Sequence, residues 1–461
     1  MESKPSLISL FTGAGGLDLG MESAGFNTLI ASELEDTYCE TLRQNQLLGR
    51  MKQKDFSEWF EKQILQKCYR NMKPEEILDL KQRVSLGVGK QAHLHNASIV
   101  PGDIRNLDSE TILKLSNLKR GKIDIVVGGP PCQPFSRAGK RQTVETSDGR
   151  LFKEFVRIVD DVRPRWFLFE NVKGLAQSKT EIARFNCNKC NHSFIGNLDE
   201  RDKAVSESLK GIACPQCSSK SLRYEMENVS GGSLFLILEE FKRLGYTCHH
   251  KLLSSADFGV PQTRERLFIV GSRDNEEFNW PTPTHSKFES EIGLKPWVGM
   301  HEAIWSHGHY KYGKINKNKA VLWVKNVVRP HDEPVTWHLD RPSPTIGAHQ
   351  SAKLAIAPKG VPEAQIFRQQ WHTLGRRQGD SPPVNVEHAY LSDRELLLLQ
   401  SFPEYWYLHG TRMERAFQIG NAVPPKFAEV IGNSILESMG IKKKSNIYQK
   451  RASYRESSLC I

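Results

Sequence analysis

The sequence has no apolar run of the roughly 18 residues needed to cross a bilayer, and its mean hydropathy is −0.49. Its first residues, Met1-Glu2-Ser3-Lys4, do not have the pattern of a secretory signal peptide. These absences predict an intracellular protein with reduced thiols, which disfavours disulfides among its nine cysteines.

The sequence also lacks a phosphate-binding loop, although it begins with a glycine-rich turn. The turn Thr12-Gly13-Ala14-Gly15-Gly16 follows an expected strand at 7–11 and precedes an expected helix at 17–26. No Gly-Lys-Ser/Thr follows, and the glycine spacing does not fit a dinucleotide loop well. A strand, glycine loop and helix nevertheless open a nucleotide-type binding unit in which the backbone approaches the ligand closely.

Two acidic residues fit the same kind of site. Glu33 ends the second expected strand, 28–32, where a carboxylate can accept hydrogen bonds from ribose hydroxyls. Asp103 follows the short apolar run Ile99-Val100, and its carboxylate suits the exocyclic amine of adenine. Either residue alone is better interpreted as a turn or helix-cap residue, but the ordered set favours a ligand.

Cys132 lies in Gly129-Pro130-Pro131-Cys132-Gln133, after the expected buried strand 123–127. The two prolines fix φ and remove amide donors, so the loop is stiff and holds the thiol away from the sheet edge. A structural cysteine more often lies inside an apolar run. The alternative is an ordinary turn cysteine, but the pattern favours a nucleophile.

Taken together, these segments resemble the DNA cytosine-5 methyltransferase family, of the type found in bacterial restriction-modification systems. The resemblance spans most of the chain, and its segments follow the family order. They are Phe11–Gly16, Glu33, Gly102-Asp103-Ile104, Pro130-Pro131-Cys132-Gln133, Phe169-Glu170-Asn171-Val172, Gln262-Thr263-Arg264-Glu265-Arg266, Arg341-Pro342-Ser343-Pro344-Thr345 and Gly420-Asn421-Ala422-Val423-Pro424-Pro425. The resemblance implies an α/β fold: a Rossmann-like S-adenosylmethionine-dependent methyltransferase sheet with a smaller irregular target-recognition domain.

The resemblance also assigns roles. Cys132 is the expected nucleophile, which adds as a thiolate to C6 of a flipped-out cytosine in duplex DNA. Glu170 follows the apolar stretch 166–169, so burial should raise its pKa and suit it to protonate N3. Arg266 is expected to hold Glu170 and the base, with Arg264 beside it in the catalytic set. The expected S-adenosylmethionine contacts are Phe11, Thr12, Gly13, Ala14, Gly15, Gly16, Leu17, Glu33, Asp103, Ile104, Pro130, Asn421 and Val423.

Four further cysteines form two C-x-x-C pairs, Cys187/Cys190 and Cys214/Cys217. Four thiolates at this spacing match a structural Zn²⁺ ribbon, and this insertion departs from the family core. It is interpreted as a module that either contacts DNA or stabilises the protein.

The expected organisation is a catalytic domain at 1–274, with insertions at about 51–96 and 185–225. A target-recognition domain at 275–410 follows, then a segment at 411–440 that returns to the catalytic domain and a basic tail at 441–461. The excess of 64 Lys and Arg over 53 Asp and Glu favours a polyanionic partner. We expect a cytoplasmic, nucleoid-associated monomer that binds double-stranded DNA, with a cognate restriction endonuclease as a functional partner and no membrane partner.

Three alternative functions fit the sequence less well. The tRNA-acting branch shares the motifs but typically carries a Cys-Phe-Thr element, which this sequence lacks. Amino-group methyltransferases need no nucleophile, so the cysteine after the two prolines argues against them. An inactive DNA-binding regulator is disfavoured because no member of the catalytic set is missing.

Overall fold

The computed structural model of the chain describes residues 4–89, 93–131, 151–206, 209–287, 293–305, 319–325, 336–338, 341–347, 352–358 and 387–441. The expected nucleophile Cys132, much of the expected recognition region and nearly all of the basic tail lie outside the described residues. No helix among the described residues is long and apolar enough to span a bilayer.

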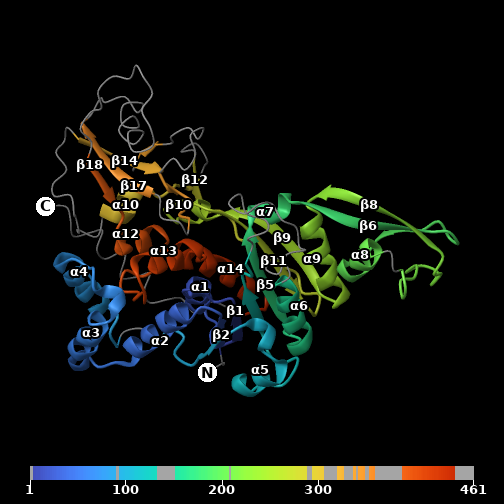
Figure 1. Ribbon diagram of the computed structural model, residues 1–461, viewed down its shortest axis with the longest axis horizontal. Helices are drawn as coiled ribbons and strands as arrows, with labels where there is room; N and C mark the ends of the chain where they lie inside the picture. Colours follow the sequence, from blue (N-terminus) through green and yellow to red (C-terminus); the bar gives the residue numbers. More distant parts are fainter. Residues whose placement is uncertain are drawn as a thin grey trace.

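A seven-stranded mixed sheet forms the centre of the molecule, with the order β3-β2-β1-β4-β5-β11-β9 (Figure 1). Its strands are β1 (Ser6–Leu10), β2 (Asn27–Glu33), β3 (Ser98–Pro101), β4 (Ile125–Gly128), β5 (Trp166–Val172), β9 (Thr247–Ser254) and β11 (Glu265–Ser272). The pairings from β3 to β5 are parallel, whereas β11 is antiparallel to both β5 and β9. The expected α/β class and most expected strands are therefore present.

The central strands are continuous apolar runs because helices cover both faces of the sheet. Phe167 and Phe169 of β5 join one hydrophobic cluster, and Trp166 and Leu168 join the other. The first cluster is covered by α5 (Ser109–Ser116), α6 (Leu151–Val162) and α9 (Gly232–Arg243). The second is covered by α1 (Gly16–Ala24) and α14 (Pro425–Ser438). The result is a three-layer α/β arrangement.

Helix α14 brings the C-terminal part of the chain back to its beginning through close contacts at small residues. A Cβ added to Gly20 of α1 would lie 2.3 Å from the Pro425 carbonyl oxygen and 2.4 Å from the Ala428 Cβ. The two helices can therefore approach this closely only with glycine at position 20. The preceding helix, α13 (Arg412–Asn421), ends just before Pro424 and Pro425, because proline interrupts the helical hydrogen-bond ladder.

The first insertion adds helices beside α2 (Asp36–Arg50), namely α3 (Phe56–Ile64) and α4 (Pro74–Ser85). The insertion packs on the segment around Tyr407, where the Tyr69 hydroxyl lies 2.6 Å from the Tyr407 hydroxyl. This segment continues from α12 (Asp393–Leu399), and the neighbouring Trp406 donates to the Ala14 carbonyl at 3.2 Å. The insertion thus supports a segment that in turn contacts the glycine loop.

The second insertion forms an arm that leaves the central sheet after α7 (Lys173–Gln177). A three-stranded sheet, ordered β7-β6-β8, contains β6 (Lys179–Cys187), β7 (Ser193–Ile195) and β8 (Leu222–Ser230), and α8 (Leu198–Val205) packs on it. The arm therefore covers residues 179–230, more than the expected 185–225, because the long strands that carry it begin well before the first cysteine. Figure 1 shows it extending to the right.

A separate four-stranded sheet lies on the other side of the molecule, at the upper left of Figure 1. Its order is β15-β14-β17-β18, formed by β14 (Lys319–Lys325), β15 (Thr336–His338), β17 (Ala352–Pro358) and β18 (Glu387–Tyr390). Near it are α10 (Met300–Trp305) and two short pairings, β12 (His285–Ser286) with β13 (Lys295–Pro296) and β10 (Gln262–Thr263) with β16 (Ser343–Pro344). The expected irregular region thus has a small antiparallel sheet of its own.

Candidate active site

The glycine loop and Glu33 are joined by hydrogen bonds at the ends of the first two strands. The Gly13 amide donates to Oε2 of Glu33 at 2.7 Å, and the Glu35 amide donates to Oε1 at 3.0 Å. The Thr12 amide donates to the Ser32 carbonyl at 3.1 Å. Burial raises the pKa of Glu33, although these amides favour its ionised form. Glu33 therefore fixes the loop, and its carboxylate oxygens have lone pairs left for further donors.

The loop has the conformation and the space that close approach of a ligand requires. Phe11 has φ 56°, which is rare for an aromatic residue and is consistent with a functional constraint. Gly13 has φ 59°, and a Cβ added there would meet no atom of the described residues within 4 Å. The helix α1 begins directly after the loop at Gly16. Open backbone beside an acidic side chain, with no phosphate-binding lysine, fits an adenosine-type ligand such as S-adenosylmethionine.

The side chains of the other expected cofactor residues differ in what they contact. Asp103 follows β3, as expected, but its carboxylate accepts from the Arg105 side chain at 2.9 Å and from the Arg105 amide. The side chains of Leu17 and Ile104 are buried in the hydrophobic clusters on opposite faces of the sheet. A Cβ added to Gly16 would lie 2.3 Å from the Val423 carbonyl, which brings the segment around Asn421 and Val423 against the start of α1.

Glu170 and Arg266 form an ion pair at the end of β5. Nε of Arg266 lies 2.9 Å from Oε1 of Glu170, and both side chains are largely buried. Strand register explains the pair, because Phe268 of β11 is directly opposite Glu170 and Arg266 is two residues away on the same face. Burial raises the pKa of Glu170, and the positive charges of Arg266 and Arg264 partly oppose that rise. The expected association of Glu170 with Arg266 is therefore present.

The chain leading to Cys132 passes directly over this carboxylate. A Cβ added to Gly129 would lie 2.6 Å from Oε2 of Glu170. The Asn171 side-chain amide donates to the buried Pro130 carbonyl at 3.2 Å, and its oxygen accepts from the Val172 amide. Sequence reasoning assigned no role to Gly129 or Asn171. Their sequence positions could have identified them, because Gly129 directly precedes Pro130 and Asn171 directly follows Glu170.

Arg264 lies at a junction of three segments. It is 1% exposed and donates from Nη1 to the Ile346 carbonyl at 3.2 Å. Its Nη2 donates to the carbonyls of Gly420 and Asn421 at 3.0 and 3.3 Å. The guanidinium thus connects the strand that carries Arg266 to the region of β16 and to the end of α13. This geometry favours a positioning role beside the charge that it contributes near Glu170.

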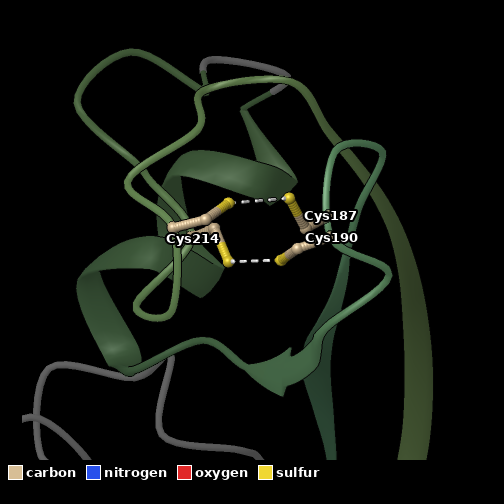
Figure 2. A group of neighbouring side chains, drawn as sticks. Cys187, Cys190 and Cys214 are labelled. Carbon is tan, nitrogen blue, oxygen red and sulfur yellow. Dashed lines mark hydrogen bonds between the residues drawn. The ribbon is translucent and has the colours of Figure 1, made fainter.

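The four cysteines of the arm converge in one cluster (Figure 2), with all four Sγ atoms within 4.8 Å of one another. Sγ of Cys187 lies 3.6 Å from Sγ of Cys217, and the Cys190–Cys214 distance is the same. Tetrahedral Zn²⁺ with bonds of ~2.3 Å requires sulfur–sulfur distances of about 3.8 Å. The residue after each pair, Asn191 or Ser218, has a left-handed φ, so the two turns are alike. The cluster fits a tetrahedral metal ion.

The comparisons with known proteins agree with this architecture. The model of the family described as C-5 cytosine-specific DNA methylase matches residues 6–68, 91–200 and 226–437. The Type II methyltransferase M1.HphI of Haemophilus parahaemolyticus is 28% identical over 93% of this chain and 86% of that protein. M.AquIA of Picosynechococcus sp. is 31% identical over 66% of this chain and 88% of that protein. M.FnuDI of Fusobacterium nucleatum is 25% identical over 95% and 96%, respectively.

The family match includes the glycine loop, Glu33, the Glu170 strand, the Arg264–Arg266 segment, α13 and nearly all of α14. It omits residues 69–90 and 201–225, the latter including the whole region between α8 and β8. The arm cysteines Cys214 and Cys217 thus lie in the unmatched part. The chain belongs to the C-5 cytosine-specific DNA methylase family and is a DNA cytosine-5-methyltransferase that uses S-adenosylmethionine.

Proposed function

We propose that the protein methylates C5 of a flipped-out cytosine within one duplex DNA sequence, as the modification enzyme of a restriction-modification system. The observation that carries the proposed site is the buried Glu170–Arg266 pair directly against Gly129, three residues before Cys132. The names of the Type II relatives support the biological context.

In the proposed reaction, Cys132 loses its proton and the thiolate forms a carbon–sulfur bond to cytosine C6. The C5–C6 π pair forms a C4–C5 double bond, and the C4–N3 π pair moves to N3, where it takes the proton of protonated Glu170. The raised pKa of Glu170 favours the protonated acid required for this step. Arg266 holds the Glu170 carboxyl group at the sheet end, and in the proposed reaction it would contact the base.

When bound, S-adenosylmethionine would supply an electrophilic methyl group, with its sulfonium sulfur leaving as the neutral thioether. Glu33 and the Gly13 loop would hold its adenosine part, and Asp103, Asn421 and Val423 would complete the site. After C5 has accepted the methyl group, a base removes the C5 proton. The restored C5–C6 double bond expels the Cys132 thiolate, and the N3 proton returns to Glu170.

The proposed division of labour follows the expected domains. Residues 1–274 carry the chemistry, 275–410 read the DNA sequence and 411–440 complete the cofactor side of the catalytic domain. We also propose that the four-cysteine cluster holds a structural Zn²⁺. We also propose that the protein acts as a monomer.

The test is incubation of the purified protein with tritium-labelled S-adenosylmethionine and either plasmid DNA or bulk tRNA, followed by nucleoside analysis. Label in 5-methyldeoxycytidine from plasmid DNA supports the proposal. Label only in tRNA would move the activity to the tRNA-acting branch, and label in neither would contradict the proposed catalysis. Cys132→Ser should lose the label while retaining DNA binding, since serine is a much weaker nucleophile than a thiolate.

A further inference from the structure

The arm at residues 179–230 leaves the central sheet at the edge that carries the active site. It follows β5 directly through the short helix α7, and β5 ends just after Glu170. Figure 1 shows the arm on one side of this edge and the β14–β18 sheet on the other. An object bound at Glu170 therefore lies between these two extensions.

Several acidic side chains of the arm lie beside cations of the protein. Glu181 and Glu227 lie opposite Asn228 and Ile182 on the half of the hairpin nearer the central sheet, and Glu225 lies opposite Arg184 just beyond its middle. There Arg184 also pairs with Glu227 at 2.7 Å. Lys153 of α6 pairs with Asp199 and Asp202 of α8. Much of the arm's acidic charge therefore faces cations of the protein itself.

The far end of the arm carries basic side chains instead. Lys189 lies between the first two cysteines, and Lys220 and Arg223 follow the second pair. All three are exposed, and none has an ion-pair partner within the part of the chain that the structure describes. Two hydrogen bonds from Asn188 to Ser221, at 3.0 and 3.1 Å, bring the backbones that carry them together.

We propose that this basic tip, defined as Lys189, Lys220 and Arg223, binds the phosphate backbone of duplex DNA outside the recognised sequence. The inference rests on the proposed function, which places duplex DNA at the same edge. Unpaired cations on a substrate-facing extension are complementary to a polyanion, and phosphate contacts need no base readout. The cysteine cluster then serves to fix the two turns that present these cations.

The length of the arm determines how far it reaches. A nine-residue strand such as β6 spans about 30 Å. With ~3.4 Å per base pair, this corresponds to about nine base pairs from the target cytosine. Contacts by the tip should therefore depend on the length of the duplex, whereas contacts by the catalytic and recognition regions should not.

The experiment uses the full chain and two duplexes, about 12 and about 30 base pairs long, centred on a cytosine that the wild-type protein methylates. The test variant carries Lys189→Ala, Lys220→Ala and Arg223→Ala. The control carries Lys52→Ala, Lys54→Ala and Arg70→Ala, which remove the same charge from exposed positions in the first insertion. Zinc content and thermal midpoint establish that both variants are folded.

On the long duplex, the test variant should bind ~10-fold more weakly at physiological salt, and the slope of log K against log salt should fall by about three. On the short duplex it should match the control, and turnover at saturating DNA should stay at the wild-type value. Equal affinity of test and control variants on the long duplex would overturn the proposal, as would equal losses on both duplexes. If the wild-type protein methylates no cytosine in plasmid DNA, the proposed function fails. If methylation is intact but the affinity loss does not depend on duplex length, only the proposal about the basic tip fails.

Discussion

Nε of Arg266 lies 2.9 Å from Oε1 of Glu170, and the two side chains are only 12% and 11% exposed. Burial penalises the charged carboxylate more than the nearby arginines favour it, so the pKa of Glu170 is raised. The raised pKa therefore favours a protonated Glu170 carboxyl group at the position where the proposed reaction needs a proton donor. Ionising this buried carboxyl group at high pH lowers the stability of the fold, whereas its protonated form can protonate cytosine N3.

Replacing Glu170 with glutamine should stabilise the protein while abolishing methylation. A carboxyl group with a raised folded pKa contributes stability below its unfolded pKa and loses it as pH rises through the folded value. Glutamine mimics the protonated acid and does not titrate. Thermal midpoints across pH 4–9 should show a gain for the variant that grows with pH above the ordinary carboxyl pKa. A variant less stable than wild type at pH 8 would refute this assignment of the raised pKa.

Gly129→Ala should impair turnover much more than binding. The added Cβ would lie 2.6 Å from Oε2 of Glu170, so the carboxyl group or the chain leading to Cys132 must shift. Misplacement on this scale can cost about 100-fold in turnover. Gly347→Ala is the matched control, since a Cβ there meets nothing within 4 Å in the part of the chain that the structure describes. Steady-state kinetics should show a lower kcat with little change in KM for S-adenosylmethionine. Equal kcat for the two variants would contradict the close approach at Gly129.

Arg264→Lys should destabilise the protein because an ammonium cannot reproduce the fork that reaches Ile346, Gly420 and Asn421. Each buried carbonyl left without a donor costs about 1–3 kcal/mol. The control is Arg120→Lys, where the guanidinium likewise donates to two backbone carbonyls but is exposed. That change should stay within ~0.5 kcal/mol.

A purely catalytic Arg264 would give a different result. Its replacement would lower turnover and leave the thermal midpoint unchanged. A positioning residue instead lowers the midpoint and raises KM for both DNA and S-adenosylmethionine, since it joins the recognition side to the segment at Asn421.

Removing the metal should unfold the arm and spare the central sheet. The arm's own hydrophobic cluster is small, with Ala183, Phe185, Ala204 and Ile212 at its centre. Such a core contributes too little burial to hold the two cysteine turns without a crosslink. Chelation, or Cys214→Ser, should therefore open protease sites between Cys187 and Cys217, while Cys68→Ser should not. Metal analysis that finds no zinc in the wild-type protein would disprove the structural metal site.

Much of the candidate site could be predicted because its chemistry lies in short segments. Glu33 and Glu170 end apolar strands, and both carboxylates lie at the same edge of the sheet, as parallel strands require. The four cysteines were predicted as one cluster from their spacing alone, and their sulfur atoms converge. In each case a local pattern determines the position of the functional group.

The remaining features depend on contacts between distant segments. The acceptors of Arg264 are backbone carbonyls at 346, 420 and 421, which leave no signature in side-chain identity. The reversed strand β11 sets the register that pairs Arg266 with Glu170, and register is a tertiary property. The arm is longer than expected. Its first strand, β6, begins at Lys179, whereas the sequence signal for the insertion is the cysteine pair that starts at Cys187.

The most direct test of the account is bisulfite sequencing of a plasmid recovered from cells that express the wild-type protein, Cys132→Ser or Glu170→Gln. The account predicts 5-methylcytosine in one recurring sequence context with the wild-type protein and in none with either variant. An unmethylated wild-type plasmid, methylation without a shared context, or undiminished methylation by either variant would contradict it.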